Sequence, residues 1–166
     1  MAIRKITKDG VVTTIISGEK CDDILTLAYH NDSDSIFYSR RTAICRILNN
    51  GTGFELWVGS LNQPGNLDGY GLNARFQGVF GISIEQSTGE IYLADTNSNS
   101  IRKVGNDRKV TTLVKGLNTP MGIQVLNNNT AVFSELYGHR IQKYDFETGS
   151  SKTIAGIGVA GTFDGF

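Results

Sequence analysis

The stretch "IYLADTNSNSIRKVGNDRKVTTLVKG", from Ile91 to Gly116, carries the strongest indication of the fold of this 166-residue chain. It contains three short runs rich in β-branched and aromatic residues, separated by polar turns with Gly, Asn and Asp. Nearly the same phrase, "IRKITKDGVVTTIISG", stands at Ile3 to Gly18. A phrase that recurs at a fixed spacing indicates a repeat protein, so the repeat has to be defined before function is considered.

The isoleucine that opens each "I-x-K/R" phrase measures the repeat. It occurs as Ile3, Ile44, Ile101 and Ile141, at spacings of 41, 57 and 40 residues. Fifteen residues after each isoleucine stands a glycine, and the four are Gly18, Gly59, Gly116 and Gly156. Periods of about 40 residues with strand-type patterning predict β-propeller blades. Helices are not supported, because apolar residues show no sustained three-to-four spacing.

Each full unit resolves into four predicted strands, here called a to d in chain order. The chain opens at strand c, so the sequence predicts an all-β, incomplete β-propeller with three four-stranded antiparallel blades and an N-terminal two-strand remnant. The predicted segments are a half blade at 1–18, blades at 21–60, 77–116 and 118–157, and at 158–166 a lead-in to a missing blade.

The long spacing of 57 residues comes from an insertion between the second and third units, Ser60 to Gly78. Its phrase "GNLDGY" lines up with "GTFDGF" at the end of the chain. Long and short links thus alternate, which indicates duplication of a two-blade unit. Because a propeller typically needs at least four blades, we expect either a fragment of a larger propeller or a protomer that self-associates to complete one.

The insertion and the third unit together resemble NHL repeats. The phrases that carry the resemblance are the lead-in "DGYGLNARF", the "GI" of strand a, the acid Asp95 that closes strand b, and "NSIRK". The fourth unit resembles the family less closely through "GHRIQKY". The second resembles it least, since Arg40 stands where the other units have Asp95 and Glu135. The resemblance implies a propeller used for binding: some members bind RNA, some bind proteins, and one branch is a metal-dependent amidating lyase.

The residues argue against an enzyme. There is no nucleophile elbow, phosphate loop or cysteine pair at a motif spacing. His30 and His139 lie in different units without a second ligand at metal spacing, and His139 is predicted to lie in strand c. We therefore predict no catalytic residue, no metal site and no cofactor, with the metal-dependent lyase as a remote alternative.

Candidate binding residues lie in the turns after strand b and in the "DG" loops. This candidate rim comprises Asp68, Tyr70, Asp95, Asn97, Asn99 and Asp164. The alternative interpretation is structural: short acidic and amide side chains hold turns by bonding backbone N–H groups, and Asp95 could pair with Arg102 or Arg75. Arg75, Arg102 and the four repeat glycines are predicted to be structural.

The net charge, the cysteine count and the lack of long apolar runs argue against further classes of protein. Lys plus Arg equals Asp plus Glu, 16 each, so the net charge is zero and RNA is disfavoured as a partner. The basic strips "IRKITK" and "RKVGNDRK" are predicted to be solvated strand edges. Cys21 and Cys45 are predicted to be free thiols rather than a disulfide. No apolar run suggests a membrane span or a signal peptide.

The sequence alone therefore favours a non-enzymatic interaction module that binds a protein or another ligand, or that self-associates, with RNA binding as the alternative. The compartment stays open: cytoplasmic by default, or extracellular if the chain is excised from a secreted parent. The sequons at Asn31, Asn50 and Asn128 would fit the second case.

Overall fold

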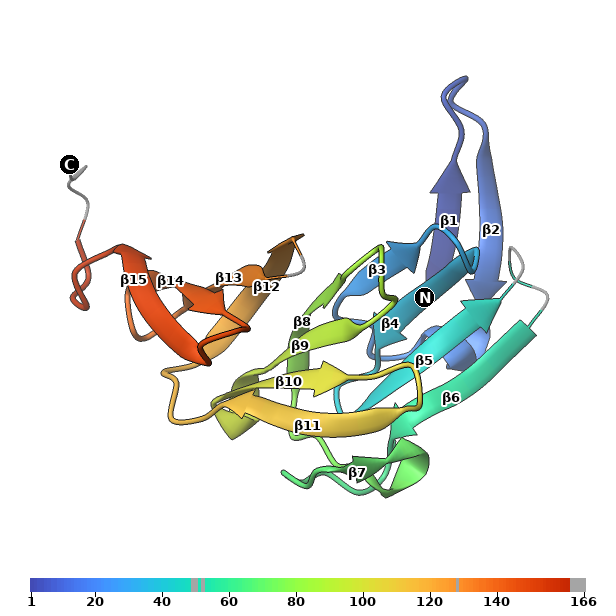
Figure 1. Cartoon of the computed structure of the whole chain (residues 1–166). Helices are drawn as coiled ribbons and strands as arrows, with labels where there is room; N and C mark the ends of the chain where they lie inside the picture. The colour runs from blue at the N-terminus through green and yellow to red at the C-terminus, as the bar shows by residue number, and fades with distance from the viewer. Residues whose placement is uncertain (49–50, 52, 128, 162–166) are drawn as a thin grey trace.

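The computed structural model describes residues 1–48, 51, 53–127 and 129–161. Three antiparallel blades and an N-terminal hairpin follow one another along an open arc (Figure 1). The hairpin, which stands for unit 1, is β1 (Ala2–Ile6) and β2 (Val12–Ser17). Blade 2 is β3 (Leu27–His30), β4 (Ser35–Ser39), β5 (Ala43–Leu48) and β6 (Gly53–Gly59). Blade 3 is β8 (Val79–Ile84), β9 (Ile91–Asp95), β10 (Ser100–Val104) and β11 (Lys109–Val114). Blade 4 is β12 (Pro120–Asn127), β13 (Thr130–Glu135), β14 (Arg140–Asp145) and β15 (Ser150–Ala155).

The predicted all-β class and the three antiparallel blades are confirmed. In each blade, strands adjacent in sequence are adjacent in the sheet. Blade 3 has a fifth strand that the sequence did not indicate, β7 (Gly69–Tyr70), which pairs with β11. Short 3₁₀ turns also occur in the described part of the chain, among them η1 (Gly18–Cys21), η3 (Gly71–Asn73) and η4 (Thr96–Ser98). Among the described residues no helix is long and apolar enough to cross a membrane.

A register shift follows the repeat isoleucine in every unit, where strand c pairs with strand d. It falls after Ile3, Ile44, Ile101 and Ile141. Opposite this point strand d has one extra residue, a β-bulge, which bends the strand and increases its twist. The four repeat glycines come just after the bulge, and all have φ between 72° and 90°. Only glycine adopts this conformation without steric cost, which explains why it recurs there.

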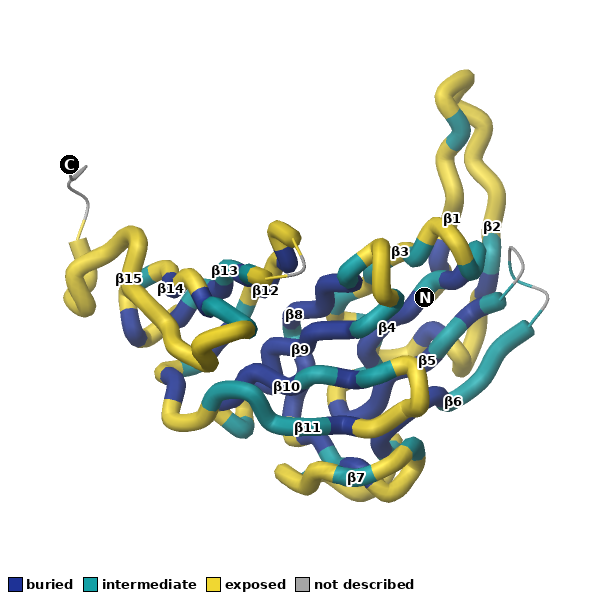
Figure 2. Tube along the Cα trace, viewed as in Figure 1, coloured by how far each residue is buried: buried dark blue, intermediate teal, exposed yellow. Residues whose placement is uncertain are grey.

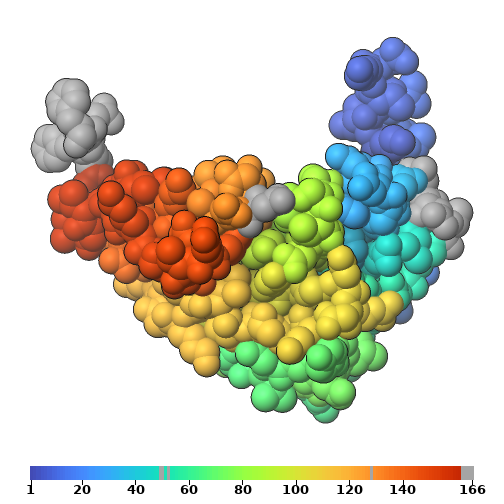
Figure 3. Space-filling model, viewed as in Figure 1, coloured from blue at the N-terminus to red at the C-terminus, as the bar shows by residue number. Residues whose placement is uncertain are grey.

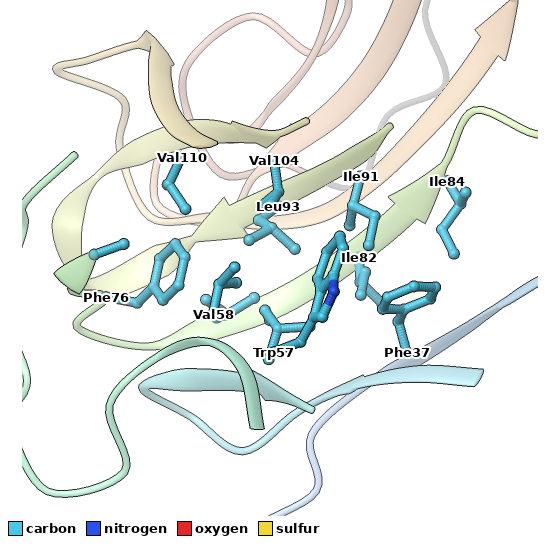
Figure 4. Close-up of a cluster of buried hydrophobic side chains, with 13 residues drawn as sticks. Phe37, Trp57, Val58, Phe76, Ile82, Ile84, Ile91, Leu93, Val104 and Val110 are labelled. Atoms are coloured by element: carbon cyan, nitrogen blue, oxygen red, sulfur yellow. The ribbon is translucent and has the colours of Figure 1, made fainter. Parts of the chain in front are cut away.

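Three apolar clusters lie between successive units and hold the arc together. Between blades 2 and 3, Trp57 and Phe37 meet edge to face with ring centroids 4.7 Å apart (Figure 4). Three of the repeat isoleucines pack toward the next unit: Ile3 against blade 2, Ile44 in this cluster and Ile101 in the cluster against blade 4. A blade is therefore stabilised mainly by the neighbours on its two sides.

The two ends of the arc leave apolar side chains in solvent. On blade 4 the repeat isoleucine Ile141 is 42% exposed and Ile154 is 53% exposed, whereas Ile44 and Ile101 are buried. At the other end the β1–β2 hairpin projects beyond blade 2, and its tip is exposed (Figure 2). The space-filling view shows these two ends rising apart, with a wide opening between them (Figure 3). The described blades thus do not close into a ring.

Candidate binding site

Arg102 on β10 is the centre of a buried polar network in blade 3. Its side chain is fully buried and pairs with Asp95 at 3.3 Å and with Asp68 at 2.6 Å. Asp95, at the end of β9, also accepts hydrogen bonds from the backbone N–H groups of Gln77 and Gly78. The network therefore ties strands b and c to the lead-in loop that precedes the blade.

The Asp68 carboxylate extends this network to strand d of the blade, β11. It accepts bonds from the backbone N–H and the hydroxyl of Thr112 on β11, at 3.0 and 2.8 Å. Burial opposes the charged form of Asp68, but the bonds from Thr112 and Arg102 outweigh it and lower the pKa of this carboxyl. The Arg102 guanidinium lies 5.3 Å from the ring centre of Phe76, the last residue of "ARF".

Blade 4 contains a second version of the network. Glu135 takes the place of Asp95 and receives two bonds from Arg140, each of 3.1 Å. It also accepts bonds from the backbone N–H of Asn118 and from Gln142, which stands at the position of Arg102. Burial favours the neutral acid, yet these donors together hold the pKa of Glu135 below its usual value.

Blade 2 contains neither the Arg102 network of blade 3 nor the Glu135 network of blade 4. Cys45 stands at the position of Arg102 and is buried, and burial raises its pKa to about 11. Arg40 stands at the position of Asp95 and donates its Nε–H to the backbone carbonyl of Asp22 at 2.9 Å. An acid that accepts from backbone N–H groups is thus replaced by a base that donates to a carbonyl. Within the described residues the two terminal nitrogens of Arg40 have no hydrogen-bond partner.

The turn between strands b and c is also shorter in blade 2. Ser39 pairs with Ile44, five residues later, whereas Ala94 pairs with Ile101 and Ser134 with Ile141, both seven residues later. In this turn Arg41 has φ = 60°, and the longer turns of blades 3 and 4 likewise hold a residue in the left-handed region, Asn99 at φ = 51° and His139 at φ = 47°.

A cavity of about 620 Å³ opens beside this turn, between blades 2 and 3, and we call it the arginine pocket. It is lined by the turn itself, the preceding link of each blade and the turn after β9. The lining residues are Asp23, Arg40, Arg41, Thr42, Leu61, Asn62, Pro64, Gln77 and Asn97. Arg41 is exposed, and no hydrogen bond or ion pair of its side chain occurs among the described residues. The pocket thus presents two guanidinium groups with free donors.

The structure divides the predicted rim into several environments. Asp68 and Asp95 lie in the Arg102 network, while Asn97 lines the arginine pocket. Asn99 accepts a bond from the backbone N–H of Thr119, as expected of a turn residue. Tyr70 is exposed on β7, with Lys109 5.8 Å from its ring centre. Asp164 lies outside the described residues.

Other sequence-based expectations can be compared with the geometry. Asp95 pairs with Arg102 and not with Arg75, which donates to the carbonyls of Leu72 and Ala74 and to Gln63. The prediction that the basic strips are solvated is wrong for Arg102, which is buried by the lead-in loop. His139 was expected in strand c but lies in the turn just before β14.

Two further expectations concern cysteines and metal ligands. Cys21 and Cys45 are free and buried, as predicted. Within the described residues there is no group of three or more His, Cys, Asp and Glu side chains that could hold a metal ion. Two of the three predicted sequons, Asn50 and Asn128, lie outside the described residues.

The sequence analysis noticed Arg40 but missed its role in a pocket. The signal was present: Arg40 breaks the repeat at a position where two other blades have an acid. The shortening of the following turn was also readable in the sequence, because Arg40 stands four residues before Ile44, whereas Asp95 and Glu135 each stand six residues before their repeat isoleucines. What could not be read was the approach of the link at Leu61–Pro64, which depends on how blades 2 and 3 pack.

Comparisons with known proteins agree with the fold. No family model matches the sequence. The chain is 25% identical over 170 residues to NHL repeat-containing protein 2 of Homo sapiens, a match that covers 90% of the chain and 22% of that protein. The chain thus spans about a fifth of the length of this curated relative.

Solved structures with the same arrangement are propeller-like. A protein of unknown function from Bacteroides thetaiotaomicron has a TM-score of 0.72 at 23% identity, over 83% of this chain and 40% of that one. A chain of the nidogen/laminin complex has a TM-score of 0.71 at 13% identity, over 92% and 57%. Virginiamycin B lyase from Staphylococcus aureus has 0.65 at 16% identity, over 92% and 48%.

These structural likenesses concern the fold alone, because the identities are low. The sequence match adds the repeat type, since it extends over nearly the whole chain. Together with the three blades, the matching glycines and the Asp95–Arg102 pair, it confirms the resemblance seen in the sequence: the chain is a run of blades of the NHL-repeat β-propeller type.

Proposed function

We propose that this part of a propeller is a non-enzymatic scaffold that binds an acidic segment of a protein partner in the arginine pocket. The observation that carries the proposal is the reversal of charge at Arg40. The position that holds a satisfied acid in blades 3 and 4 holds a base with free donors in blade 2, at the wall of a cavity.

The chemistry of the pocket favours a carboxylate. The Nε bond to Asp22 fixes the Arg40 guanidinium and leaves its terminal nitrogens to donate, and a planar guanidinium binds a carboxylate with two parallel bonds. Arg41 adds a second positive charge, while Asp23 is the one acid among the nine lining residues. Asn62, Gln77 and Asn97 can bond the backbone of a bound segment.

RNA binding is the second candidate, because guanidinium groups also bind phosphates. Recognition of single-stranded RNA uses aromatic side chains on which bases stack. The residues that line the arginine pocket include no aromatic residue, and the chain has no net charge. Both features favour the protein partner.

The experiment compares three fluorescent probes by anisotropy with the 166-residue chain: a deca-glutamate peptide, a neutral glycine–serine peptide and a ten-nucleotide uridine RNA. We expect saturable binding of the glutamate peptide that weakens with salt. The double variant Arg40→Gln/Arg41→Gln abolishes it, whereas Lys152→Gln, an exposed position on β15, leaves it unchanged. Stronger binding of the RNA, or an equal loss with Lys152→Gln, contradicts the proposal.

A second variant separates binding from folding. Arg41→Gly relieves the unfavourable φ of 60° and is expected to raise the free energy of unfolding by up to about 1 kcal/mol. It also removes one of the two charges of the pocket, so the affinity for deca-glutamate falls. A variant that is more stable and binds less cannot be explained by loss of structure.

A further inference from the structure

We propose that a second cavity between blades 2 and 3 binds a small aromatic acid, a planar ring that carries an anionic group. The arginine pocket lies at the turns between strands b and c, whereas this cavity lies at the other end of the strands, at the a–b and c–d turns. It has a volume of about 190 Å³, and we call it the tryptophan cavity. Its lining residues, all in the two blades with four described strands each, are His30, Ser33, Phe37, Arg46, Trp57, Gly89, Asn106 and Arg108.

Between blades 3 and 4 an aromatic ring occupies the corresponding place. Phe146, five residues after the repeat isoleucine of blade 4, stacks on Tyr92 of blade 3 with ring centroids 4.7 Å apart. Tyr92 matches Phe37, because each stands two residues before the strand b residue that pairs with the repeat isoleucine. In blade 3 the residue five after the repeat isoleucine is Asn106, which has no ring. The tryptophan cavity therefore lies where blade 4 has an aromatic side chain.

The aromatic wall of the cavity can receive a ring from a ligand. The Arg46 guanidinium lies 5.4 Å from the ring centre of Phe37. A cation at this distance does not exclude a second contact, because Tyr92 has the Lys103 ammonium 5.9 Å from its ring centre and still stacks on Phe146. Offset-stacked and edge-to-face contacts both stabilise aromatic pairs. The ring of the ligand is therefore expected to lie on Phe37.

The charges beside this wall favour an anion. Arg46 and Arg108 share one acid, Glu55, at 3.6 and 2.9 Å. The Arg108 side chain is 44% exposed, and its Nε and Nη1 atoms have no hydrogen-bond partner among the described residues. Two guanidinium groups against one carboxylate leave an excess of positive charge, and a guanidinium donates parallel bonds to a carboxylate. The anionic group of the ligand is therefore expected at Arg108.

Arg108 is also an exception to the repeat. It lies in the c–d turn of blade 3 with φ = 66°, where unit 1 has Gly10 at φ = 80° and blade 4 has Gly149 at φ = 66°. All three stand two residues before the strand d residue that pairs with the fourth residue of the repeat phrase. A side chain makes this backbone conformation less favourable than it is for glycine. The exception places a guanidinium beside the cavity.

Hydrogen bonds fix the turns around the cavity before any ligand binds. Asn106 donates its amide N–H to the backbone carbonyl of Thr88 at 2.6 Å. Gln86 of blade 3 donates to the carbonyl of Tyr29 at 2.8 Å and accepts from the backbone N–H of Asn31 at 3.1 Å, both in blade 2. Because these walls are already ordered, less conformational entropy is lost on binding.

Trp57 is the one tryptophan of the chain, so its fluorescence reports directly on this cavity. The probe is benzoate, titrated at constant ionic strength and with excitation at a wavelength that benzoate does not absorb. Cyclohexanecarboxylate has the charge without a planar ring, and benzamide has the ring without the charge. We expect a saturable change with benzoate and at least tenfold weaker binding of the other two. No saturable response to benzoate, or equal affinity for either of the other compounds, overturns the proposal.

Protein variants locate the binding site. Asn106→Phe supplies the ring that Phe146 supplies in blade 4, and is expected to abolish benzoate binding because it fills the cavity. Arg108→Gly introduces the residue of the other c–d turns, so it is expected to fold and to lower the affinity for benzoate about tenfold. Benzoate binding that Arg108→Gly leaves unchanged, or that a folded Asn106→Phe variant retains, contradicts the proposal.

The matched control is Arg41→Gly, which makes the same change of charge and backbone in the arginine pocket. It is expected to leave the affinity for benzoate unchanged and to weaken the binding of deca-glutamate. Arg108→Gly is expected to do the reverse. An equal loss of benzoate binding with Arg41→Gly would place benzoate outside the tryptophan cavity, so this proposal and the proposed function can fail separately.

Discussion

The Nη1 atom of Arg102 lies 3.3 Å from Oδ2 of Asp95, and both side chains are fully buried. The pair joins adjacent strands of blade 3 and is completed by Asp68 from a loop 34 residues earlier in the chain. Blade 3 is thus held by an ionic contact to its own lead-in as well as by its sheet.

Removal of the buried acid is expected to destabilise the protein strongly. Asp95→Ala leaves Arg102 with Asp68 as its one ion-pair partner among the described residues and leaves the N–H groups of Gln77 and Gly78 without their acceptor. We expect the free energy of unfolding to fall by about 3–5 kcal/mol, as when one member of a buried pair is removed. Denaturant unfolding measures it, with Asp9→Ala in the exposed hairpin turn as the control. Unchanged stability together with lost binding of a partner would make Asp95 a binding residue instead.

The repeat glycines are expected to differ in their tolerance of alanine. Gly116 has φ = 72° and open space around the position of a Cβ atom, so Gly116→Ala costs about 1–2 kcal/mol for the left-handed backbone alone. At Gly59 a Cβ atom would lie 2.7 Å from the carbonyl oxygen of Thr42 and 2.9 Å from Phe76. Gly59→Ala therefore costs about 1–3 kcal/mol more. Thermal unfolding of the two variants side by side checks the order, and equal losses would contradict the crowding at Gly59.

Stability is expected to fall in acid partly through Glu135. Because its pKa is lower in the folded protein than the ordinary value of 4.5, its contribution is full above that value and is lost as the pH falls through the folded pKa. Glu135→Gln should be less stable than the unaltered chain at pH 7, and the difference should shrink as the pH falls below 4.5 through the lower folded pKa. Urea unfolding at several pH values measures the difference in the free energy of unfolding, and a difference that grows as the pH falls would contradict the expectation.

The bare face of blade 4 is expected to cause self-association. Ile141 and Ile154 are exposed where the equivalent residues of blades 2 and 3 pack on the next blade. At about 25 cal/mol per Å², a few hundred Å² of apolar surface amounts to several kcal/mol. Light scattering at micromolar concentration should detect oligomers that Ile154→Lys reduces and Leu72→Lys, on η3, does not. A folded monomer that persists across a hundredfold range of concentration would refute this expectation.

The sequence predicted the blades well because their determinants are local. In each of the four repeat units, alternating apolar residues are followed at a fixed offset by the glycine after the bulge. Four units with the same pattern make a stronger prediction than any one unit alone. The burial of Arg102 was not predictable in this way. Strand alternation gives the side of the sheet on which a residue lies, whereas burial depends on Asn66, Asp68 and Phe76 folding over it from the lead-in loop.

The candidate site was predictable only in part for the same reason. The repeat exposed Arg40 as an exception, and the acids after strand b were rightly given a structural alternative. A cavity, however, depends on how segments distant in the sequence pack together. The arginine pocket lies where two turns and a long link of blades 2 and 3 leave space between them, and no local sequence pattern predicts this packing.

The fifth strand of blade 3 has a consequence for how the protein would aggregate. β7 pairs with the start of β11, and Asp68 bonds the Thr112 N–H farther along the same strand, so part of that sheet border is already occupied. β15, the corresponding border of blade 4, is exposed along its whole length and is the last strand of its sheet. Addition of a strand from another chain is therefore expected to be easier at β15 than at β11.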